Sequence, residues 1–354
     1  MDSAIVNLKP QTSNLKPSMK ILFVWPGLTG YMGDCWRALA KRAQVKVLVD
    51  GTGLGKNFTE DVMSGIDWTR VTEDNVIGEI RMFAPDAIIV VGWHRKLPRK
   101  VVFAKELESV AKFLVMDMPW RWSVRCLAAR FVLRRYLRRF RGILVHGEPS
   151  ARYARWLGFA PEQIHRHCIC GVNMGKFGGL EVSKFGSLDE PSNPPTLQTS
   201  KPLTLQPSNP PNLQTSNFLF VGRKVKEKGI ETLKKAYEIY RRDGGKWALT
   251  MPEWIDPKDV PGMMREHACL VLPSLWEPWG VVVAEAKAAG MRIIVSDKVG
   301  ARFDIPCDEV VPAGDAKALA AAMKRVEDWK FGGLEDWKFG CEAWAERVVE
   351  SLRV

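Results

Sequence analysis

The chain has 354 residues, 46% of them hydrophobic, and a formal net charge of +12 at pH 7. This length provides one or two domains with cores of their own, and the apolar run Ala87–Val91 is far too short to span a bilayer. The stretch 1–18 has no apolar signal core, and the seven scattered cysteines are typical of free thiols in a reducing compartment. We therefore expect a globular cytoplasmic protein with anionic partners, rather than a disulfide scaffold or a membrane-spanning protein.

Three stretches differ in composition from a folded domain. Residues 7–18 repeat the word Asn-Leu-Lys-Pro, and residues 191–217 are rich in Pro, Ser, Asn and Thr. An eight-residue unit that begins at Glu327 is repeated from Glu335. Proline- and serine-rich sequence buries too little apolar surface to offset chain entropy. We therefore expect a disordered tail over residues 1–18 and an insertion in the middle of the chain.

The remaining sequence alternates short apolar runs with amphipathic helical patterns. Strands are expected at Lys20–Trp25, Val45–Val49, Ala87–Val91, Phe113–Met116, Gly142–His146, Phe218–Val221, Trp247–Met251, Cys269–Pro273, Arg292–Ser296 and Val310–Val311. Helices are expected at Asp34–Arg42, Gly229–Arg241, Val281–Ala289, Ala316–Val326 and Glu342–Leu352. This alternation predicts an α/β protein with two doubly wound, Rossmann-like domains that face each other across a cleft. Ligands bind such sheets at the carboxyl ends of their strands.

The strongest motif follows the strand expected at Cys269–Pro273. Pro278 and Gly280 form a turn, so Glu277 lies in a loop and Glu285 lies about one turn inside the next helix. The start of a helix offers free N–H groups to phosphate or sugar oxygens, and an ionised carboxylate accepts hydrogen bonds from hydroxyl groups. Taken alone, two such glutamates are more often solvated surface residues.

A second motif follows the strand expected at Phe218–Val221. Gly222 and Arg223 come directly after this strand, and Lys228 stands five residues further on, before a glycine. Cations at the carboxyl end of a strand are well placed to neutralise a diphosphate. Taken alone, these residues are more often solvated loop charges.

In this order and at this separation, the two motifs resemble the E-x7-E and G-R…K-G elements of the family-4 glycosyltransferases (glycosyl transferases group 1, GT-B fold). Other stretches extend the resemblance over most of residues 19–326. They are the glycine loop Gly30–Gly33, the strand end Gly142–Gly147, and Gly171-Val172-Asn173 with Phe177.

The resemblance implies an enzyme that moves a sugar from a nucleotide-diphosphate sugar to an acceptor, with retention and without a metal or another cofactor. It implies that Glu277 lies beside the transferred sugar, that Glu285 binds the ribose, and that Arg223 and Lys228 hold the diphosphate. Such preorganised cations stabilise charge that develops on the leaving group. The rest of the implied donor site is Gly222, the backbone of Trp279 and Gly280, Gly30 and Gly33.

The composition, which marks the tail and the insertion, and the resemblance, which implies the two domains, together divide the chain. A low-complexity tail spans residues 1–18, and an acceptor-binding domain spans residues 19–172. A linker with an insertion spans residues 173–217, and a nucleotide-sugar-binding domain spans residues 218–340. A final helix in residues 341–354 is expected to pack back on the first domain.

The sequence departs from the family pattern at several positions. Trp279 stands where phenylalanine is common. Many members carry a histidine at the end of the strand expected at Ala87–Val91, and the nearest histidine here is His94, which is either a donor-sugar contact or an ordinary loop residue. A second common histidine position reads Asp117 and is assigned to the acceptor side. The stretch between Met251 and Cys269 is short, which leaves the nucleobase open.

The segment Arg121–Arg141 is strongly basic, and apolar residues are interleaved with its arginines. The arginines within it are Arg125, Arg130, Arg134, Arg135, Arg138 and Arg139, and the apolar residues are Leu127, Phe131, Leu133, Leu137 and Phe140. This pattern predicts one helix with a packed face and a cationic face. The cationic face suits anionic lipid headgroups on the inner side of a membrane, or an anionic acceptor. The alternative is a solvated helix face.

Three other functions stay open. Besides a transferase, the chain could be a non-transferase GT-B homologue, such as a nucleotide-sugar epimerase, or an inactive homologue. A protein of another class would bind nucleic acid or an anionic membrane through its basic residues. Nucleic-acid binding requires basic and aromatic residues on an exposed surface. Because the arginines here share a helix with core-type apolar residues, no nucleic-acid partner is expected.

Overall fold

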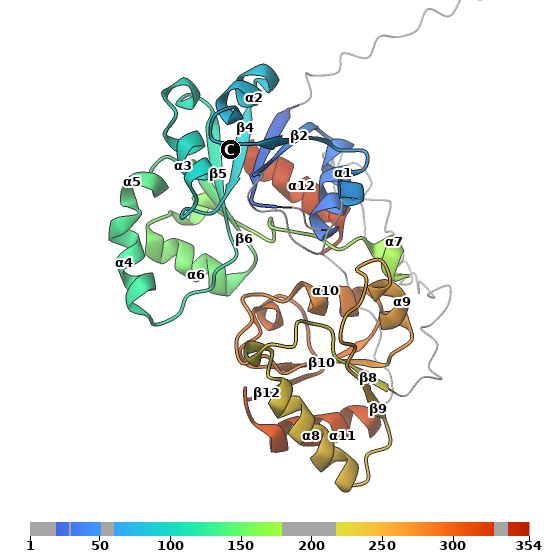
Figure 1. Cartoon of the computed structure of the whole chain (residues 1–354). Coiled ribbons are helices and arrows are strands. Elements are labelled where there is room, and N and C mark those ends of the chain that lie inside the picture. The colour runs from blue at the N-terminus through green and yellow to red at the C-terminus, as the bar shows by residue number, and fades with distance from the viewer. Residues whose placement is uncertain (1–18, 28–29, 51–59, 179–216, 329–338, 354) are drawn as a thin grey trace, which may run out of the picture.

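The computed structural model describes residues 19–27, 30–50, 60–178, 217–328 and 339–353 (Figure 1). Within these ranges the chain forms two α/β domains, each built on a parallel sheet that is flanked by helices. No helix in the described ranges is both long and apolar enough to cross a membrane. The expected tail over 1–18, most of the expected insertion, and most of the eight-residue repeat lie outside the described residues.

The first domain contains a seven-stranded parallel sheet in the order β3-β2-β1-β4-β5-β6-β7. Its strands are β1 (Lys20–Trp25), β2 (Gln44–Asp50), β3 (Asp67–Val71), β4 (Ala87–Val91), β5 (Ala111–Met116), β6 (Gly142–Val145) and β7 (Ile164–Arg166). The helices are α1 (Gly30–Ala40), the short 3-10 helix η1 (Glu60–Met63), α2 (Val76–Phe83), α3 (Lys96–Phe103), α4 (Val124–Val132), α5 (Arg134–Leu137) and α6 (Glu148–Leu157).

The sheet of the first domain is buried on both faces, which explains its continuous apolar strands. Along β1, Phe23 belongs to one hydrophobic cluster, whereas its neighbours Leu22 and Val24 belong to another. Successive side chains of a strand point to opposite faces, so an entirely apolar strand requires cover on both sides. The helices seen on either side of the sheet in Figure 1 provide that cover.

The second domain contains a five-stranded parallel sheet in the order β12-β11-β10-β8-β9. Its strands are β8 (Asn217–Leu219), β9 (Ala248–Thr250), β10 (Cys269–Leu272), β11 (Arg292–Ser296) and β12 (Glu309–Val311). Its helices are η4 (Lys226–Lys228), α8 (Ile230–Arg242), α9 (Val260–Arg265), α10 (Val281–Ala288), η5 (Gly300–Phe303) and α11 (Ala316–Asp328). Because β8 lies between β9 and β10, the chain changes direction across the sheet between β8 and β10. The crevice at such a switch point is where doubly wound sheets bind ligands.

The chain passes between the domains twice, and the two passages are hydrogen-bonded to each other. The Val172 N–H donates to the Phe339 carbonyl over 2.7 Å, and the Cys341 N–H donates to the Val172 carbonyl over 3.1 Å. The short helix α7 (Met174–Phe177) follows the first passage, and α12 (Cys341–Leu352) follows the second. α12 returns to the first domain and packs beside α1, where Glu346 pairs with Arg42 at 2.8 Å (Figure 1).

The expected fold class is confirmed, and most of the expected strands occur within two residues of their predicted ends. Two strands were not predicted. β3 has the sequence Asp-Trp-Thr-Arg-Val and lies at the sheet edge, so it lacks a continuous apolar run. β7 has only three residues and lies at the other edge.

The prediction of one helix over the basic segment, with its apolar residues packed inside, is wrong. The segment forms α4 and α5, which are separated at Leu133. Leu137 and Phe140 are buried, but Phe131 is 73% exposed and Leu127 also lies at the surface. Only one side of α4 packs on the domain, through the buried Cys126, and apolar residues on its other sides, such as Phe131 and Val132, are left exposed beside the arginines.

The packing of α12 against the first domain generates a prediction. Trp344 is 1% exposed, and its indole N–H has no hydrogen-bond partner among the described residues. We expect Trp344→Ala to lower the free energy of unfolding by about 3–5 kcal/mol, because it removes a large buried ring. Trp344→Phe should cost less than about 1.5 kcal/mol, because it keeps much of the volume and loses no hydrogen bond. Denaturant unfolding of both variants measures the difference, and equal costs would contradict this account of the helix.

Candidate active site

The loops after β8 and β10 meet at the switch point of the second sheet. We call residues 226–229 the Lys228 turn and residues 273–280 the Glu277 loop. The N–H groups of Leu275 and Trp276 both donate to the Glu227 carbonyl, over 2.8 Å and 3.2 Å. The backbone of the Lys228 turn thus holds the backbone of the Glu277 loop.

The side chains of the two loops also meet. The Lys228 Nζ donates to the Glu277 Oε2 in an ion pair whose side chains are only 17% and 12% exposed. A largely desolvated pair of this kind is stable only while both partners are present, since either charge alone would be buried without compensation. The structure thus brings together two residues that lie 49 positions apart in the sequence.

Glycine is required where these loops approach each other. Gly229 has a positive φ of 70°, and a Cβ there would lie 2.1 Å from the carbonyl oxygen of Pro273. Gly280 has a φ of 104° and directly precedes α10, and a Cβ there would lie 3.2 Å from the Glu277 Cγ. Gly229 therefore excludes a side chain on conformational and on steric grounds, whereas Gly280 disfavours one mainly through its positive φ. The N-terminus of α10 is left open beside the Glu277 loop.

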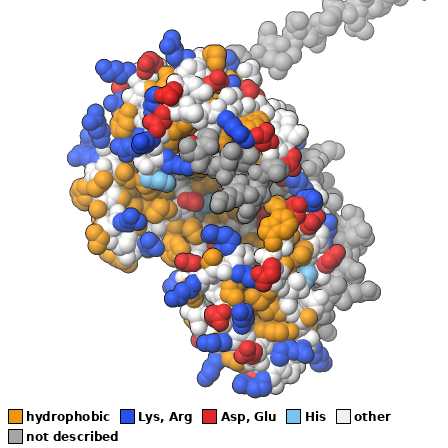
Figure 2. Space-filling model, viewed as in Figure 1, with side chains coloured by type: hydrophobic (Ala, Val, Ile, Leu, Met, Phe, Trp, Pro, Cys, Tyr) orange, Lys and Arg blue, Asp and Glu red, His pale blue; other side chains and the backbone are white. Residues whose placement is uncertain are grey.

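Two carboxylates, Glu285 and Asp117, lie close enough to Cys170 for their charges to act on it. Burial raises the pKa of Glu285, on α10, to about 7. Burial also raises the pKa of Asp117, which follows β5, although solvent reaches this side chain. A carboxylate that is closely surrounded by protein and still open to water is typical of a cleft, and Figure 2 shows a hollow between the two domains. The charges of both residues act on Cys170, whose pKa is raised mainly by burial and also by its neighbour Cys341.

The remaining predicted residues surround this centre less closely. Arg223 and Gly222 are exposed directly beyond β8, and His94 is exposed beyond β4. No hydrogen bond or ion pair among the described residues joins Arg223 or His94 to Glu277. Gly30 is the first residue of α1. Gly33 is buried, and a Cβ there would lie 2.3 Å from the Val62 carbonyl oxygen, so packing against η1 already accounts for this glycine.

Sequence reasoning missed the contacts that join the Glu277 loop to the first domain. Trp279 was expected to contribute its backbone, but its ring stacks on His146, which follows β6, and its indole N–H donates to Asp304. The guanidinium of Arg121 lies 5.3 Å from the centre of the Trp276 ring. His146 could have been predicted to lie near the site, because it ends a strand expected from the sequence. Asp304 belongs to no motif or periodic pattern that would have predicted its role. Within the described residues, no group of three or more His, Cys, Asp or Glu side chains could hold a metal ion.

Part of the second domain matches a known family. Residues 244–331, which include Glu277 and Glu285, match the family model of the glycosyl transferases group 1. A Klebsiella pneumoniae protein, described as an uncharacterized 41.2 kDa protein in the cps region, is 28% identical to the chain over 100 residues. This match covers 23% of the chain and 27% of the relative, so the chain spans about a quarter of the length of the curated relative it matches.

Solved structures resemble the chain over both domains. Sucrose-phosphate synthase from Thermosynechococcus elongatus is similar with a TM-score of 0.61 and 17% identity, over 95% of this chain and 94% of that one. Anabaena Alr3699/HepE in complex with UDP and glucose is similar with a TM-score of 0.56 and 14% identity, over 95% and 99%. A Listeria monocytogenes protein named for UDP-N-acetylglucosamine 2-epimerase is similar with a TM-score of 0.61 and 13% identity, over 95% and 96%. At these identities the likeness concerns the fold.

The two facing Rossmann-like domains and these matches agree with the resemblance inferred from the motifs. The chain therefore has the GT-B fold, and its residues 244–331 match the family model of the glycosyl transferases group 1.

Proposed function

We propose that the protein transfers a sugar from a nucleoside-diphosphate sugar to an acceptor, with retention of configuration and without a metal ion. The observation that carries the proposal is the Lys228–Glu277 ion pair at the switch point of the second sheet. A cation and a carboxylate there suit a donor that carries a charged diphosphate next to a hydroxyl-rich sugar. The family match of residues 244–331 supports the same reaction class, and a solved neighbour was crystallised with UDP and glucose.

In this proposal the donor binds beside the Lys228–Glu277 ion pair. A diphosphate brings negative charge to Lys228, which is already held in place by Glu277, and the exposed Arg223 closes over the phosphates. Backbone N–H groups of Trp279 and Gly280, at the start of α10, bind sugar oxygens. The ribose binds Glu285, and Gly222, Gly30 and Gly33 complete the donor side. His94 is assigned to the donor sugar and Asp117 to the acceptor.

The chemistry follows from the placement of charge. Cleavage of the sugar–phosphate bond builds negative charge on the diphosphate and positive, oxocarbenium-like charge on the sugar. Lys228 and Arg223 stabilise the first charge, and the Glu277 carboxylate stabilises the second. Lys228 and Glu277 are held by each other before the reaction begins, so these two groups need little reorganisation as the charge develops. In this proposal the acceptor attacks from the face that the diphosphate leaves, which retains the configuration.

The first test compares two lysines of one turn. Lys228 pairs with Glu277, whereas Lys226 is exposed and makes no ion pair among the described residues. With the nucleoside-diphosphate sugar that most raises the melting temperature in a panel, we expect Lys228→Ala to lower the rate of diphosphate release about 10²–10³-fold. Lys226→Ala should keep the wild-type rate. Glu277→Gln should lower kcat with little change in the KM for the donor.

Product analysis in the same assay separates the alternatives. A transferase releases the nucleoside diphosphate, whereas an epimerase changes the sugar and keeps it attached. An inactive homologue does neither, although it still binds a nucleotide. Equal rates for the two lysine variants, or a wild-type kcat for Glu277→Gln, would mean that this pair is not the catalytic centre.

The second test uses the raised pKa of Glu285. The pKa is raised by burial to about 7, so the carboxyl is protonated below this pH and ionised above it. An ionised carboxylate accepts hydrogen bonds from both ribose hydroxyls, so donor affinity should rise as the pH rises towards 7. We expect the Kd for UDP-glucose to fall by up to about tenfold per pH unit below 7. Titration calorimetry of Glu285→Gln should give a higher Kd for UDP-glucose that does not change with pH. If the Kd of this variant depends on pH as steeply as that of the wild type, Glu285 is not the titrating group.

We also propose that the enzyme rests on an anionic membrane through α4 and α5. Trp122, Val124 and Val132 are about four-fifths exposed, at 82%, 82% and 78%, and Phe131 lies beside them on α4. Figure 2 shows hydrophobic side chains interspersed with Lys and Arg over this part of the first domain. Exposed apolar residues ringed by arginines match the boundary between acyl chains and anionic headgroups.

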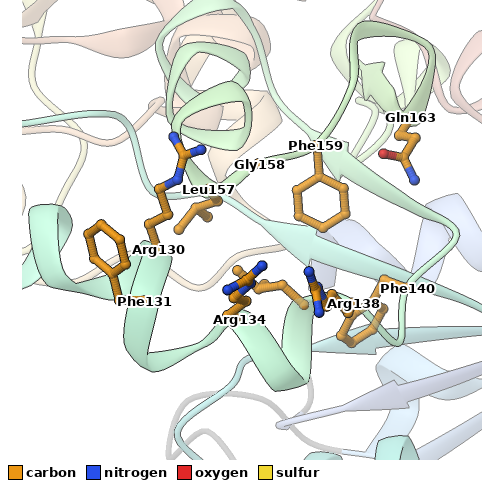
Figure 3. A pocket seen from close by; sticks show the side chains of 10 residues that line it. Arg130, Phe131, Arg134, Arg138, Phe140, Leu157, Gly158, Phe159 and Gln163 are labelled. Carbon is orange, nitrogen blue, oxygen red and sulfur yellow. The ribbon is translucent and has the colours of Figure 1, made fainter.

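A groove of about 560 Å³ lies next to this surface, between α4, α5 and the C-terminal end of α6. Figure 3 shows Arg130 of α4, Arg134 of α5 and Arg138 at the end of α5 around it, with Phe131 and Phe159 among its apolar walls. Arg134 and Arg138 make no ion pair among the described residues, so their charges are available to an anionic headgroup. The apolar walls suit the start of an acyl chain.

Vesicle sedimentation tests this surface. We expect binding to phosphatidylcholine vesicles that contain phosphatidylglycerol, and weaker binding as the ionic strength rises. Because each basic residue near an anionic surface contributes about 1 kcal/mol, replacing Arg134 and Arg138 by Glu should weaken binding at least about tenfold. The charge-matched control replaces the exposed Lys235 and Lys317 of the second domain by Glu and should bind as the wild type does. The proposal would be contradicted if the protein bound equally well to vesicles of pure phosphatidylcholine. It would also be contradicted if the control variant lost as much binding as the Arg134 and Arg138 variant.

A further inference from the structure

We infer that His146, Trp279 and Asp304 are positioning residues that hold the Glu277 loop in place only when the two domains are closed. The inference rests on the proposed role of Glu277, and it assigns a function to the side chains of three residues, of which only Trp279 was a predicted donor contact, through its backbone. The three residues form an interdomain latch, since His146 belongs to the first domain and the other two belong to the second.

The contact between the domains is a closely fitted ring stack. The ring centres of His146 and Trp279 are 4.5 Å apart, and their planes differ by 5°. Both residues are buried, at 6% and 4% exposure. Burial, together with the charge of His167, lowers the pKa of His146 to about 3, so the imidazole is neutral near neutral pH. Two neutral rings therefore stack where the domains touch, and water is excluded from their contact.

Asp304 joins the same contact from a different direction. Its Oδ2 accepts a hydrogen bond from the Trp279 indole over 2.8 Å. Its carboxylate also accepts a hydrogen bond from the backbone N–H of Glu148, at the start of the ten-residue helix α6 of the first domain. A Cβ on Gly147 would lie 1.9 Å from that same Oδ2, so only glycine admits the carboxylate there. Burial raises the pKa of Asp304, and this backbone N–H at the positive end of α6 offsets part of that effect, so one side chain contacts both domains.

The latch is rigidly connected to Glu277. The Gly300 N–H donates to the Glu277 carbonyl over 3.1 Å, and the Ala301 N–H donates to the Trp279 carbonyl over 2.8 Å. A Cβ on Gly300 would lie 2.0 Å from the Pro278 carbonyl oxygen, so η5 and the loop pack backbone against backbone. η5 leads directly into Asp304. A rotation of the first domain that separates His146 from Trp279 would thus pull on the segment that carries the catalytic carboxylate.

The latch also lies close to the point where the chain passes between the domains. The ring of Phe339, in the second passage, is centred 6.0 Å from Trp279 and 5.3 Å from His167. Arg121, over the Trp276 ring, adds a contact at the other end of the loop. Opening about the two passages therefore has to separate these aromatic contacts, and closure restores them together with the position of Glu277.

The test compares tryptophans of the second domain. Trp279→Ala removes the stack and the indole donor, Trp279→Phe keeps a ring without the donor, and Trp254→Ala alters a tryptophan that is 66% exposed. With UDP-glucose as the probe, we expect Trp279→Ala to lower kcat at least tenfold while the Kd for UDP changes less than about threefold. Trp279→Phe should lose less than Trp279→Ala, and Trp254→Ala should match the wild type.

Small-angle scattering of the same proteins gives a readout that does not depend on activity. We expect Trp279→Ala, and Asp304→Ala as a second variant if the first folds poorly, to increase the radius of gyration without UDP. A wild-type kcat in Trp279→Ala, or a loss of kcat with an unchanged radius of gyration in both variants, would overturn the inference. If the wild-type protein releases no diphosphate from any nucleoside-diphosphate sugar, the proposed function fails, and the scattering arm still decides whether the latch holds the domains closed.

Discussion

The site depends on one constraint, which is that β8 and β10 are parallel neighbours on either side of a change in strand order. Their carboxyl ends lie at the same edge, so the loops that follow have to meet there. This arrangement brings the cation of Lys228 to the carboxylate of Glu277, and the pair is sufficiently desolvated for each charge to require the other. Gly229 is a consequence of that meeting, because the two loops approach too closely there for a side chain.

The first domain contacts the Glu277 loop and Asp304 mainly through a neutral ring and through backbone N–H groups. His146 presents a neutral ring to Trp279, and the start of α6 presents backbone N–H groups to Asp304. Both contacts need the domains to be close together, unlike the Lys228–Glu277 pair, which lies wholly within the second domain. Opening of the domains would therefore leave the Lys228–Glu277 pair intact for the donor diphosphate, but it would release the Glu277 loop from its contacts with the first domain. Burial raises the pKa of both Glu285 and Asp117, and the charges of both act on Cys170 near the first passage between the domains.

The arginine-rich segment shows where a pattern of residue types stops being informative. Interleaved apolar and basic residues predicted a helix with a packed side and a cationic side. In the structure Leu137 and Phe140 do pack, but Phe131 is exposed with Trp122, because α4 touches the domain along one side only. Whether an apolar side chain of this segment is buried depends on neighbouring helices that are distant in sequence. The exposed group carries the membrane proposal, and the sequence alone had assigned its main member, Phe131, to the core.

The sequence by itself determined the fold class, the strands of both sheets except two edge strands, and the identity of the paired loops. Apolar runs of five residues between amphipathic helices have few alternatives to buried parallel strands, and the E-P-W-G turn and the K-G turn are local. Only the tertiary structure decided that Trp279 stacks on His146 and that Asp304 binds the start of α6. These contacts join residues of different domains that share no spacing or periodicity, so their existence depends on how the two sheets are placed against each other.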